Sequence, residues 1–230
     1  MTTASTTPST ARPPVKLGVL ISGEGTNLQA IIDAIDRDDL KADVRVVISN
    51  KRTAPGLERA RRRGIAAIVI EHRAFPSREA FDSALVASLR HHDVELVICA
   101  GFMRLLSPVM IAAFRDRIMN IHPALCPAFP GLDAQQQALD YGARFSGCTV
   151  FFVTEGVDDG PVIVQAVVPV HQDDNEAALA ARIHAEEHRI YPFAIRLYQE
   201  GRLELRGRKV YIRDASPIGP IANNVNPRLP

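Results

Sequence analysis

Near its N-terminus the chain reads Val15-Lys16-Leu17-Gly18-Val19-Leu20-Ile21, followed by Ser22-Gly23-Glu24-Gly25-Thr26-Asn27. The first stretch is an apolar run of strand length, and the second contains two glycines that allow a sharp turn. A helical pattern begins at once, with apolar side chains about one turn apart at Leu28, Ile31, Ile32 and Ile35. A strand, a tight loop and a helix in this order predict the first part of a βαβ unit.

The same alternation continues along the chain. Runs rich in Val and Ile recur at 44–48, 65–70 and 94–99, and a second helical pattern lies at Phe81, Ala84, Leu85 and Leu89. Gly64 follows the helical run 57–63, where a glycine commonly ends a helix. We therefore predict an α/β fold, with a mostly parallel open sheet that has helices on both faces.

The second half of the chain adds the elements expected to complete the sheet. A fifth strand spans 117–121, and strands at 148–153 and 161–170, joined by the turn that contains Asp158, predict antiparallel strands toward the C-terminal half. Asp173 and Glu176 fit a capping box that begins a long helix, which Pro192 is expected to kink or divide. A short helix around 135–139 and a hairpin at 203–212 around Gly207 are also expected.

Composition limits the classes of function. The 230 residues are 47% hydrophobic, enough for one compact domain, which we place at 15–213 between a disordered leader (1–14) and a proline-containing tail (214–230). Lys and Arg number 27 and Asp and Glu 26, and this formal charge of +1 predicts no nucleic-acid or membrane partner. The sequence has neither the apolar segment of a secretory signal nor an apolar run of membrane-spanning length.

Three cysteines occur, Cys99, Cys126 and Cys148, with no C-x-x-C pair and no zinc-ligand spacing. A sparse, odd set indicates reduced thiols in a cytoplasmic protein, and no bound metal is expected. Cys126 lies near the residues discussed below and could be taken for a nucleophile. No activating motif surrounds it, so a packing role is the favoured interpretation.

The loop Ser22–Asn27 is typical of an anion site, because the free N–H groups of a helix start favour negative charge. In open α/β sheets, ligands bind outside the carboxyl ends of strands, where this loop falls. A dinucleotide fingerprint would need a small residue in place of Leu28 and an acid after the second strand, where Ser49-Asn50-Lys51 stands. A monophosphate therefore fits better than NAD, and a tight turn without a ligand is the alternative.

Asn120-Ile121-His122-Pro123 ends the fifth predicted strand, so the side chains of Asn120 and His122 share one face. With Asp158 they would supply what acyl transfer to an amine needs. An amide and a protonated imidazole can hold a developing oxyanion, and a carboxylate favours that protonated state. Taken singly, His122 could be a loop residue before proline, and Asp158-Asp159-Gly160 could be a simple turn.

Four motifs together resemble phosphoribosylglycinamide formyltransferase, in order and with similar spacing over about Lys16 to Leu205. They are Gly23-Glu24-Gly25-Thr26-Asn27-Leu28-Gln29-Ala30, Ala100-Gly101-Phe102-Met103-Arg104-Leu105-Leu106-Ser107-Pro108, Asn120-Ile121-His122-Pro123-Ala124 and Asp158-Asp159-Gly160-Pro161. The resemblance implies transfer of the formyl group of 10-formyltetrahydrofolate to the amine of 5-phosphoribosylglycinamide in de novo purine synthesis. Neither substrate is a macromolecule, and the enzyme would be a monomer or a homodimer.

The resemblance also implies roles for single residues. Asn120 would touch the formyl group, His122 would be the general acid, and Asp158 would keep His122 protonated. Gly25, Thr26 and Asn27 would hold the substrate phosphate, and Glu187 would meet the ribose. The folate site would be lined by Arg78, Met103, Arg104, Leu105, Leu106 and Asn120.

The chain departs from the family pattern near the site. Phe151 stands where the family commonly has His, Ala128 where it has Lys, and Asp133 and Gln135 replace two histidines. Three rival functions remain. A 10-formyltetrahydrofolate hydrolase and another folate-dependent formyltransferase, such as methionyl-tRNA formyltransferase, share the fold. A non-catalytic nucleotide- or folate-binding protein would have kept only the pockets.

Overall fold

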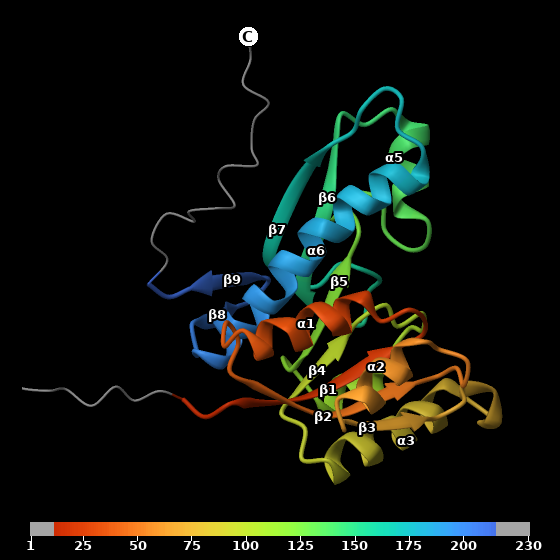
Figure 1. Cartoon of the computed structure of the whole chain (residues 1–230), viewed down its shortest axis with the longest axis vertical. Coiled ribbons are helices and arrows are strands. Elements are labelled where there is room, and N and C mark those ends of the chain that lie inside the picture. The colour runs from red at the N-terminus through yellow and green to blue at the C-terminus, as the bar shows by residue number, and fades with distance from the viewer. Residues whose placement is uncertain (1–11, 215–230) are drawn as a thin grey trace, which may run out of the picture.

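The computed structural model describes residues 12–214, and its centre is a seven-stranded sheet in the order β3-β2-β1-β4-β5-β6-β7 (Figure 1). Five strands are parallel, namely β1 (Val15–Ile21), β2 (Ala42–Ser49), β3 (Ala66–Val69), β4 (Leu96–Cys99) and β5 (Ile118–His122). The strands β6 (Phe145–Phe152) and β7 (Val162–Pro169) are antiparallel to their neighbours. The predicted mostly parallel sheet with antiparallel strands toward the C-terminal half is confirmed.

Helices cover both faces of the sheet, and each face has its own hydrophobic core (Figure 1). One core contains residues of α1 (Thr26–Asp36), α2 (Gly56–Arg62), α5 (Ala134–Tyr141) and α6 (Glu176–Gln199). The other contains residues of α3 (Arg78–His91) and α4 (Pro108–Ala113), and a short turn, η1 (His72–Ala74), precedes α3. The predicted hairpin around Gly207 is formed by β8 (Leu203–Arg206) and β9 (Lys209–Ile212).

The long helix α6 packs across one face of the sheet, against β6 and β7. Tyr191, in its middle, is fully buried, and its hydroxyl lies 3.0 Å from the carbonyl oxygens of both Cys99 and Met119. The hydroxyl can donate to one of these carbonyls at a time. This contact ties α6 to the ends of β4 and β5.

Two expectations for α6 are wrong. The helix is capped by Asn175, whose side chain accepts from the Ala178 N–H at 2.9 Å, and Asp173 lies outside it. Asn is as good an N-cap as Asp, so the N-cap of this helix could be either Asp173 or Asn175. Pro192 lies inside the continuous helix and does not divide it, whereas a kink there stays a prediction. An interior proline costs about 3 kcal/mol, whereas each fully buried large apolar side chain contributes about 1.5–3 kcal/mol, and α6 buries several, such as Ile190 and Ile195.

The expected leader and tail fall mostly on residues 1–11 and 215–230, which lie outside the described residues. Between residues 12 and 214, no helix combines the length and apolar character needed to cross a bilayer.

The strand order reverses between β1 and β4, because the chain moves from β1 toward β3 in one direction and from β4 toward β5 in the other. Ligands of open α/β sheets bind at the carboxyl ends of strands at such a point. The loop after β1, the loop after β4 and the end of β5 all lie along this edge, so the topology gathers the segments that the sequence singled out.

Candidate functional site

His122 is the last residue of β5 and is buried, with acceptors facing both ring nitrogens. Its Nδ1 lies 3.4 Å from the Asp158 Oδ2, and its Nε2 lies 2.8 Å from the Phe129 carbonyl oxygen. A neutral imidazole has one N–H and could satisfy one of these acceptors, whereas the doubly protonated ring satisfies both. These two acceptors hold the ring in place at the end of β5.

Asp158 reaches His122 from the loop between β6 and β7. Its backbone is left-handed, with a φ of 49°, a conformation that Asp tolerates better than most residues. The same Oδ2 that faces His122 also accepts from the Gly131 N–H at 2.9 Å. The carboxylate thus joins two loops above the end of β5.

Asn120 is half-buried, two residues before His122 on β5. Side chains two apart on a strand share a face. Within residues 12–214 the Asn120 amide makes no hydrogen bond, so its N–H groups are available to a ligand. An imidazolium and an uncommitted amide at one strand end can stabilise negative charge on a carbonyl oxygen.

The loop before α1 has the shape of an anion site. Gly25 precedes the helix with a φ of 69°, and a Cβ on this residue would lie 2.9 Å from the Cα of Gly56, the first residue of α2. Gly56 in turn donates its N–H to the Gly23 carbonyl at 3.0 Å. The first N–H groups of α1, from Thr26 onward, have no acceptor within the helix. These contacts leave the start of α1 open to a negatively charged group.

Asn27 and Glu187 connect this loop to α6. The Asn27 Nδ2 donates to the Glu187 Oε2 at 2.9 Å, although the residues are 160 positions apart. Burial raises the pKa of the Glu187 carboxyl, whereas this hydrogen bond and the charges of His184 and His122 lower it. The Asn27 Oδ1 is buried without a hydrogen-bond partner among the described residues.

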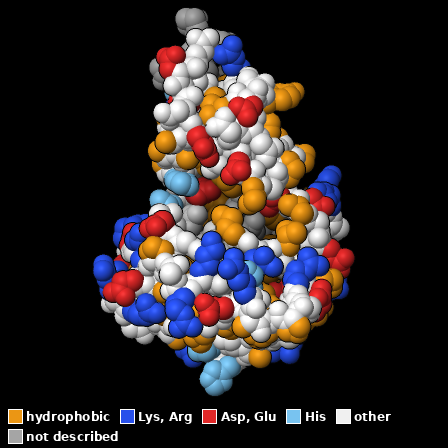
Figure 2. Space-filling view, turned by 90° about the vertical axis from the view of Figure 1, so that its right-hand side faces the viewer, with side chains coloured by type: hydrophobic (Ala, Val, Ile, Leu, Met, Phe, Trp, Pro, Cys, Tyr) orange, Lys and Arg blue, Asp and Glu red, His pale blue; other side chains and the backbone are white. Residues whose placement is uncertain are grey.

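The predicted folate-site residues lie on the loop after β4 and at the start of α3. Met103 and Leu105 are 60% and 59% exposed, unusual for large apolar side chains, and Arg104 is also exposed. Arg78 begins α3 and lies 3.8 Å from Glu79. Figure 2 shows hydrophobic and basic side chains lying near one another on one face of the molecule.

Sequence reasoning missed the residues that hold the loop 123–130 in place. The Thr149 hydroxyl donates to the Ala124 carbonyl at 2.6 Å and accepts from the Cys126 N–H at 3.0 Å. Gln165 adds a bond to the Cys126 carbonyl at 3.1 Å. Thr149 pairs with His122 across the β5–β6 ladder. The signal that could have revealed it is a hydroxyl in the predicted strand 148–153, whose other residues are apolar.

Phe151, the clearest departure from the family pattern, is buried and pairs with Asn120 across the same ladder. It therefore adds an apolar wall next to the site. Asp133 stands at the N-terminal boundary of α5 with a φ of 56°, and Ala128 lies exposed on the loop before it. These two changes concern the rim of the site.

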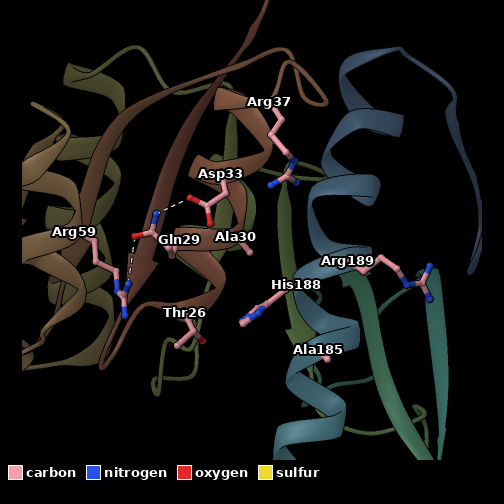
Figure 3. A pocket seen from close by; sticks show the side chains of 9 residues that line it. All are labelled: Thr26, Gln29, Ala30, Asp33, Arg37, Arg59, Ala185, His188 and Arg189. Carbon is pink, nitrogen blue, oxygen red and sulfur yellow. Dashed lines mark hydrogen bonds between the residues drawn. The ribbon is translucent and has the colours of Figure 1, made fainter.

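A groove of about 570 Å³ lies between α1 and α6, to one side of the loop Ser22–Asn27 (Figure 3). Figure 3 shows the His188 ring directed toward α1, while Arg189 points away, and Gln29 bridges Arg59 and Asp33. Of the predicted site residues, only Thr26 lines this groove. The groove is therefore separate from the His122–Asp158 pair.

The cysteines do not have the character of nucleophiles. Cys99 and Cys148 are buried and Cys126 is half-buried. Burial raises the pKa of the Cys99 thiol to about 12 and raises the pKa of the Cys126 thiol despite its hydrogen bond with Thr149. Among residues 12–214, no three His, Cys, Asp or Glu side chains are grouped as they would be to hold a metal ion.

Comparison with known proteins agrees with this geometry. Residues 15–195 match the family described as formyl transferase. The chain is 46% identical to phosphoribosylglycinamide formyltransferase of Escherichia coli over 194 residues, 84% of this chain and 92% of that protein. It is 50% identical to the trifunctional purine biosynthetic protein adenosine-3 of Drosophila pseudoobscura over 196 residues, although this covers only 14% of that longer protein.

Solved structures show the same relationship. The crystal structure of glycinamide ribonucleotide transformylase 1 from Symbiobacterium toebii superposes with a TM-score of 0.85 at 56% identity, over 86% of this chain and 94% of that chain. Phosphoribosylglycinamide formyltransferase from Coxiella burnetii superposes with a TM-score of 0.83 at 41% identity, over 86% of this chain and 93% of that chain. The chain therefore belongs to the formyl transferase family, among the phosphoribosylglycinamide formyltransferases.

Proposed function

We propose that this protein transfers the formyl group of 10-formyltetrahydrofolate to the amine of 5-phosphoribosylglycinamide, a step of de novo purine synthesis. The observation that carries the proposal is the buried His122, with acceptors at both ring nitrogens, beside the uncommitted Asn120 amide. The sequence identity to the Escherichia coli enzyme over nearly its whole length supports the same substrate pair.

The reaction proceeds by direct transfer. The glycinamide nitrogen attacks the formyl carbon, a C–N bond forms, and the carbonyl oxygen becomes an oxyanion. Protonated His122 and the Asn120 amide stabilise that charge. The intermediate then collapses, the bond to N10 of the folate breaks, N10 takes up a proton, and the attacking nitrogen loses one. No acyl-enzyme forms, which agrees with the burial of Cys99 and Cys148 and with the raised pKa of the half-buried Cys126 thiol.

We assign the oxyanion to the Nδ1–H of His122. A charge-assisted N–H···O bond is usually about 2.7–2.9 Å long, whereas Nδ1 and the Asp158 oxygen are 3.4 Å apart. The Nδ1–H group can therefore be shared between the Asp158 carboxylate and a second acceptor. Asp158 also accepts the amine proton through water in this scheme.

The ribonucleotide lies between α1 and α6. Gly25, Thr26 and Asn27 hold its phosphate at the N-terminus of α1, where the helix dipole favours an anion. Glu187 accepts from a ribose hydroxyl, and the Asn27 Oδ1, buried without a partner among the described residues, is an acceptor beside it. These contacts align the amine with the formyl carbon, and such alignment can lower the barrier by several kcal/mol.

The folate lies against the loop after β4. The exposed side chains of Met103 and Leu105 pack on its ring system, together with Leu106. Arg78 and Arg104 offer positive charge to its carboxylates, and Asn120 reaches its formyl group. The folate and the ribonucleotide therefore approach His122 from opposite sides of the β1–β4 junction.

The remaining properties follow from the same proposal. The domain spans 15–213, acts on two small molecules without a metal, and has no nucleic-acid or membrane partner. We place the protein in the cytoplasm, consistent with its three free thiols, as a monomer or a homodimer.

A steady-state assay tests the function. Purified protein should formylate 5-phosphoribosylglycinamide with 10-formyltetrahydrofolate and no added metal, and the release of tetrahydrofolate should depend on the amine substrate. Release that is independent of the amine would instead show a hydrolase. Binding of both substrates without turnover would show a binding protein.

A further inference from the structure

The Ser22 hydroxyl stands between the loops that leave β1 and β4. Ser22 follows β1 directly and is only 5% exposed. Its Oγ accepts from the Met103 N–H at 2.9 Å and donates to the Asn50 Oδ1 at 2.6 Å. A second bond, from the Ser22 N–H to the Gly101 carbonyl at 3.0 Å, attaches the same loop. Two bonds from one residue therefore fix the start of the loop 100–107.

The other end of this loop is also fixed by a buried polar group. The carboxylate of Asp82, on α3, is fully buried and accepts from the N–H of Ser107, which precedes α4. Between these two anchors, Met103 and Leu105 are mostly exposed. Their own packing contributes little to the course of the loop. Its position depends on the hydrogen bonds at its ends and on Phe102 and Leu106, which pack against the core.

The direction of the Ser22 hydroxyl is set by its surroundings. A hydroxyl has one proton, and Ser22 donates it in the hydrogen bond to the Asn50 Oδ1. The lone pairs of the hydroxyl oxygen are therefore left to accept from the Met103 N–H. Asn50 is 3% exposed, and its Nδ2 lies 3.3 Å from the His72 Nδ1. The Asn50 amide is therefore held with its oxygen toward Ser22.

We propose that Ser22 is a positioning residue for the folate co-substrate. Its hydroxyl holds the backbone at Met103, and thereby the apolar side chains that contact the folate. Ser22 also begins the loop proposed to bind the phosphate, so one hydroxyl joins the two substrate subsites across the β1–β4 junction. This inference rests on the proposed function, because Met103 and Leu105 must be the folate contacts.

Ser22→Ala tests the proposal. Removing one buried hydrogen bond should raise the KM for 10-formyltetrahydrofolate, and the Kd of tetrahydrofolate measured by calorimetry, by about three- to tenfold. The value of kcat should stay within about twofold, since the lost contact acts on bound substrate and transition state alike. A merely structural role would reduce the folded fraction, which lowers the apparent kcat without changing the KM.

Ser146→Ala is the matched control. Ser146 is 1% exposed on β6, and its hydroxyl has no hydrogen-bond partner among the described residues. It should leave the folate KM and the tetrahydrofolate Kd unchanged. In addition, Asn50→Leu should raise the folate KM, and its combination with Ser22→Ala should raise it by less than the product of the two single effects.

An unchanged tetrahydrofolate Kd in Ser22→Ala would overturn the inference, as would an equal rise in Ser146→Ala. The proposed function fails separately. If the unsubstituted protein binds tetrahydrofolate but does not formylate the ribonucleotide, the enzyme assignment falls and the Kd comparison still decides the role of Ser22. If it does not bind tetrahydrofolate at all, both proposals are wrong.

Discussion

The Asn27 amide donates a hydrogen bond of 2.9 Å to the Glu187 carboxylate, and so joins the first turn of α1 to the middle of α6. Both side chains are buried, at 8% and 4% exposure. A carboxylate kept from water with one hydrogen bond is costly for the fold. The Glu187 carboxylate is therefore explained by function rather than by stability. In the proposed function it accepts a hydrogen bond from a ribose hydroxyl.

Glu187→Gln should raise the melting temperature at neutral pH by a few degrees. Burial raises the pKa of the Glu187 carboxyl above its ordinary value of 4.5, so the native state holds this proton more tightly than the unfolded chain. The free energy of unfolding then falls as the pH rises from 4.5 to the raised native pKa, because the native state binds more protons than the unfolded chain in that range. A glutamine removes that penalty and can also donate to the partnerless Asn27 Oδ1.

Calorimetric melting at several pH values measures this effect. The gain from Glu187→Gln should shrink as the pH falls from the raised native pKa toward 4.5, and it should vanish below about 4.5, where both states are protonated. The exposed Glu155 provides the control, and Glu155→Gln should leave the melting temperature nearly unchanged. A lower melting temperature for Glu187→Gln at pH 7 would contradict the prediction.

His122→Ala should lower kcat by at least about 10²-fold, the usual cost of losing one oxyanion donor. The circular dichroism spectrum and the Kd of tetrahydrofolate should change little. His91, exposed on α3, is the matched histidine, and His91→Ala should keep full turnover. Turnover near normal in His122→Ala would rule out the role assigned to the imidazole.

Asp158→Asn should lower kcat. Asn tolerates the left-handed backbone at this position, so the loop keeps its course while the negative charge facing Nδ1 is lost. The contact that orients the His122 ring is then weaker, because a neutral amide oxygen is a poorer acceptor than a carboxylate. The steady-state kcat measures this, with the neighbouring Asp159→Asn as control. An unchanged kcat would show that the carboxylate does not act through His122.

Cys126→Ser should retain turnover within about twofold, because burial raises the pKa of the thiol and so lowers the fraction present as the reactive thiolate. Iodoacetamide at pH 7 should modify the native protein slowly, and mass spectrometry after timed quenching gives the rate. Rapid alkylation that is blocked by 10-formyltetrahydrofolate, together with an inactive Cys126→Ser variant, would instead show that Cys126 is a nucleophile.

Much of the fold was predictable because its signals are local. The apolar runs and the 3.6-residue spacing of Leu28, Ile31 and Ile32 gave the strands and helices, and the sheet class followed from their alternation. The cap of α6 was not fixed by these signals, since Asp173 and Asn175 are both good N-caps and the packing of α6 selected the second.

The site was predictable only in part. Asn120 and His122 share a face because strand geometry requires it, and the structure brings Asp158 to within 3.4 Å of the ring. The bond from His122 to the Phe129 carbonyl could not be foreseen, because it involves backbone on an irregular loop. The Asn27–Glu187 contact joins residues far apart in sequence, and only the topology of the sheet brings them together.

The contact between Gly25 and Gly56 has a consequence for engineering. A Cβ on either glycine would lie 3.1 Å or less from the backbone of the other, so the two positions form one steric unit. A mutagenesis library aimed at new folate donors should hold both glycines constant, because any side chain there would deform the loop. Met103 and Leu105 are better positions to randomise, because their side chains are exposed and can change without disturbing a neighbour.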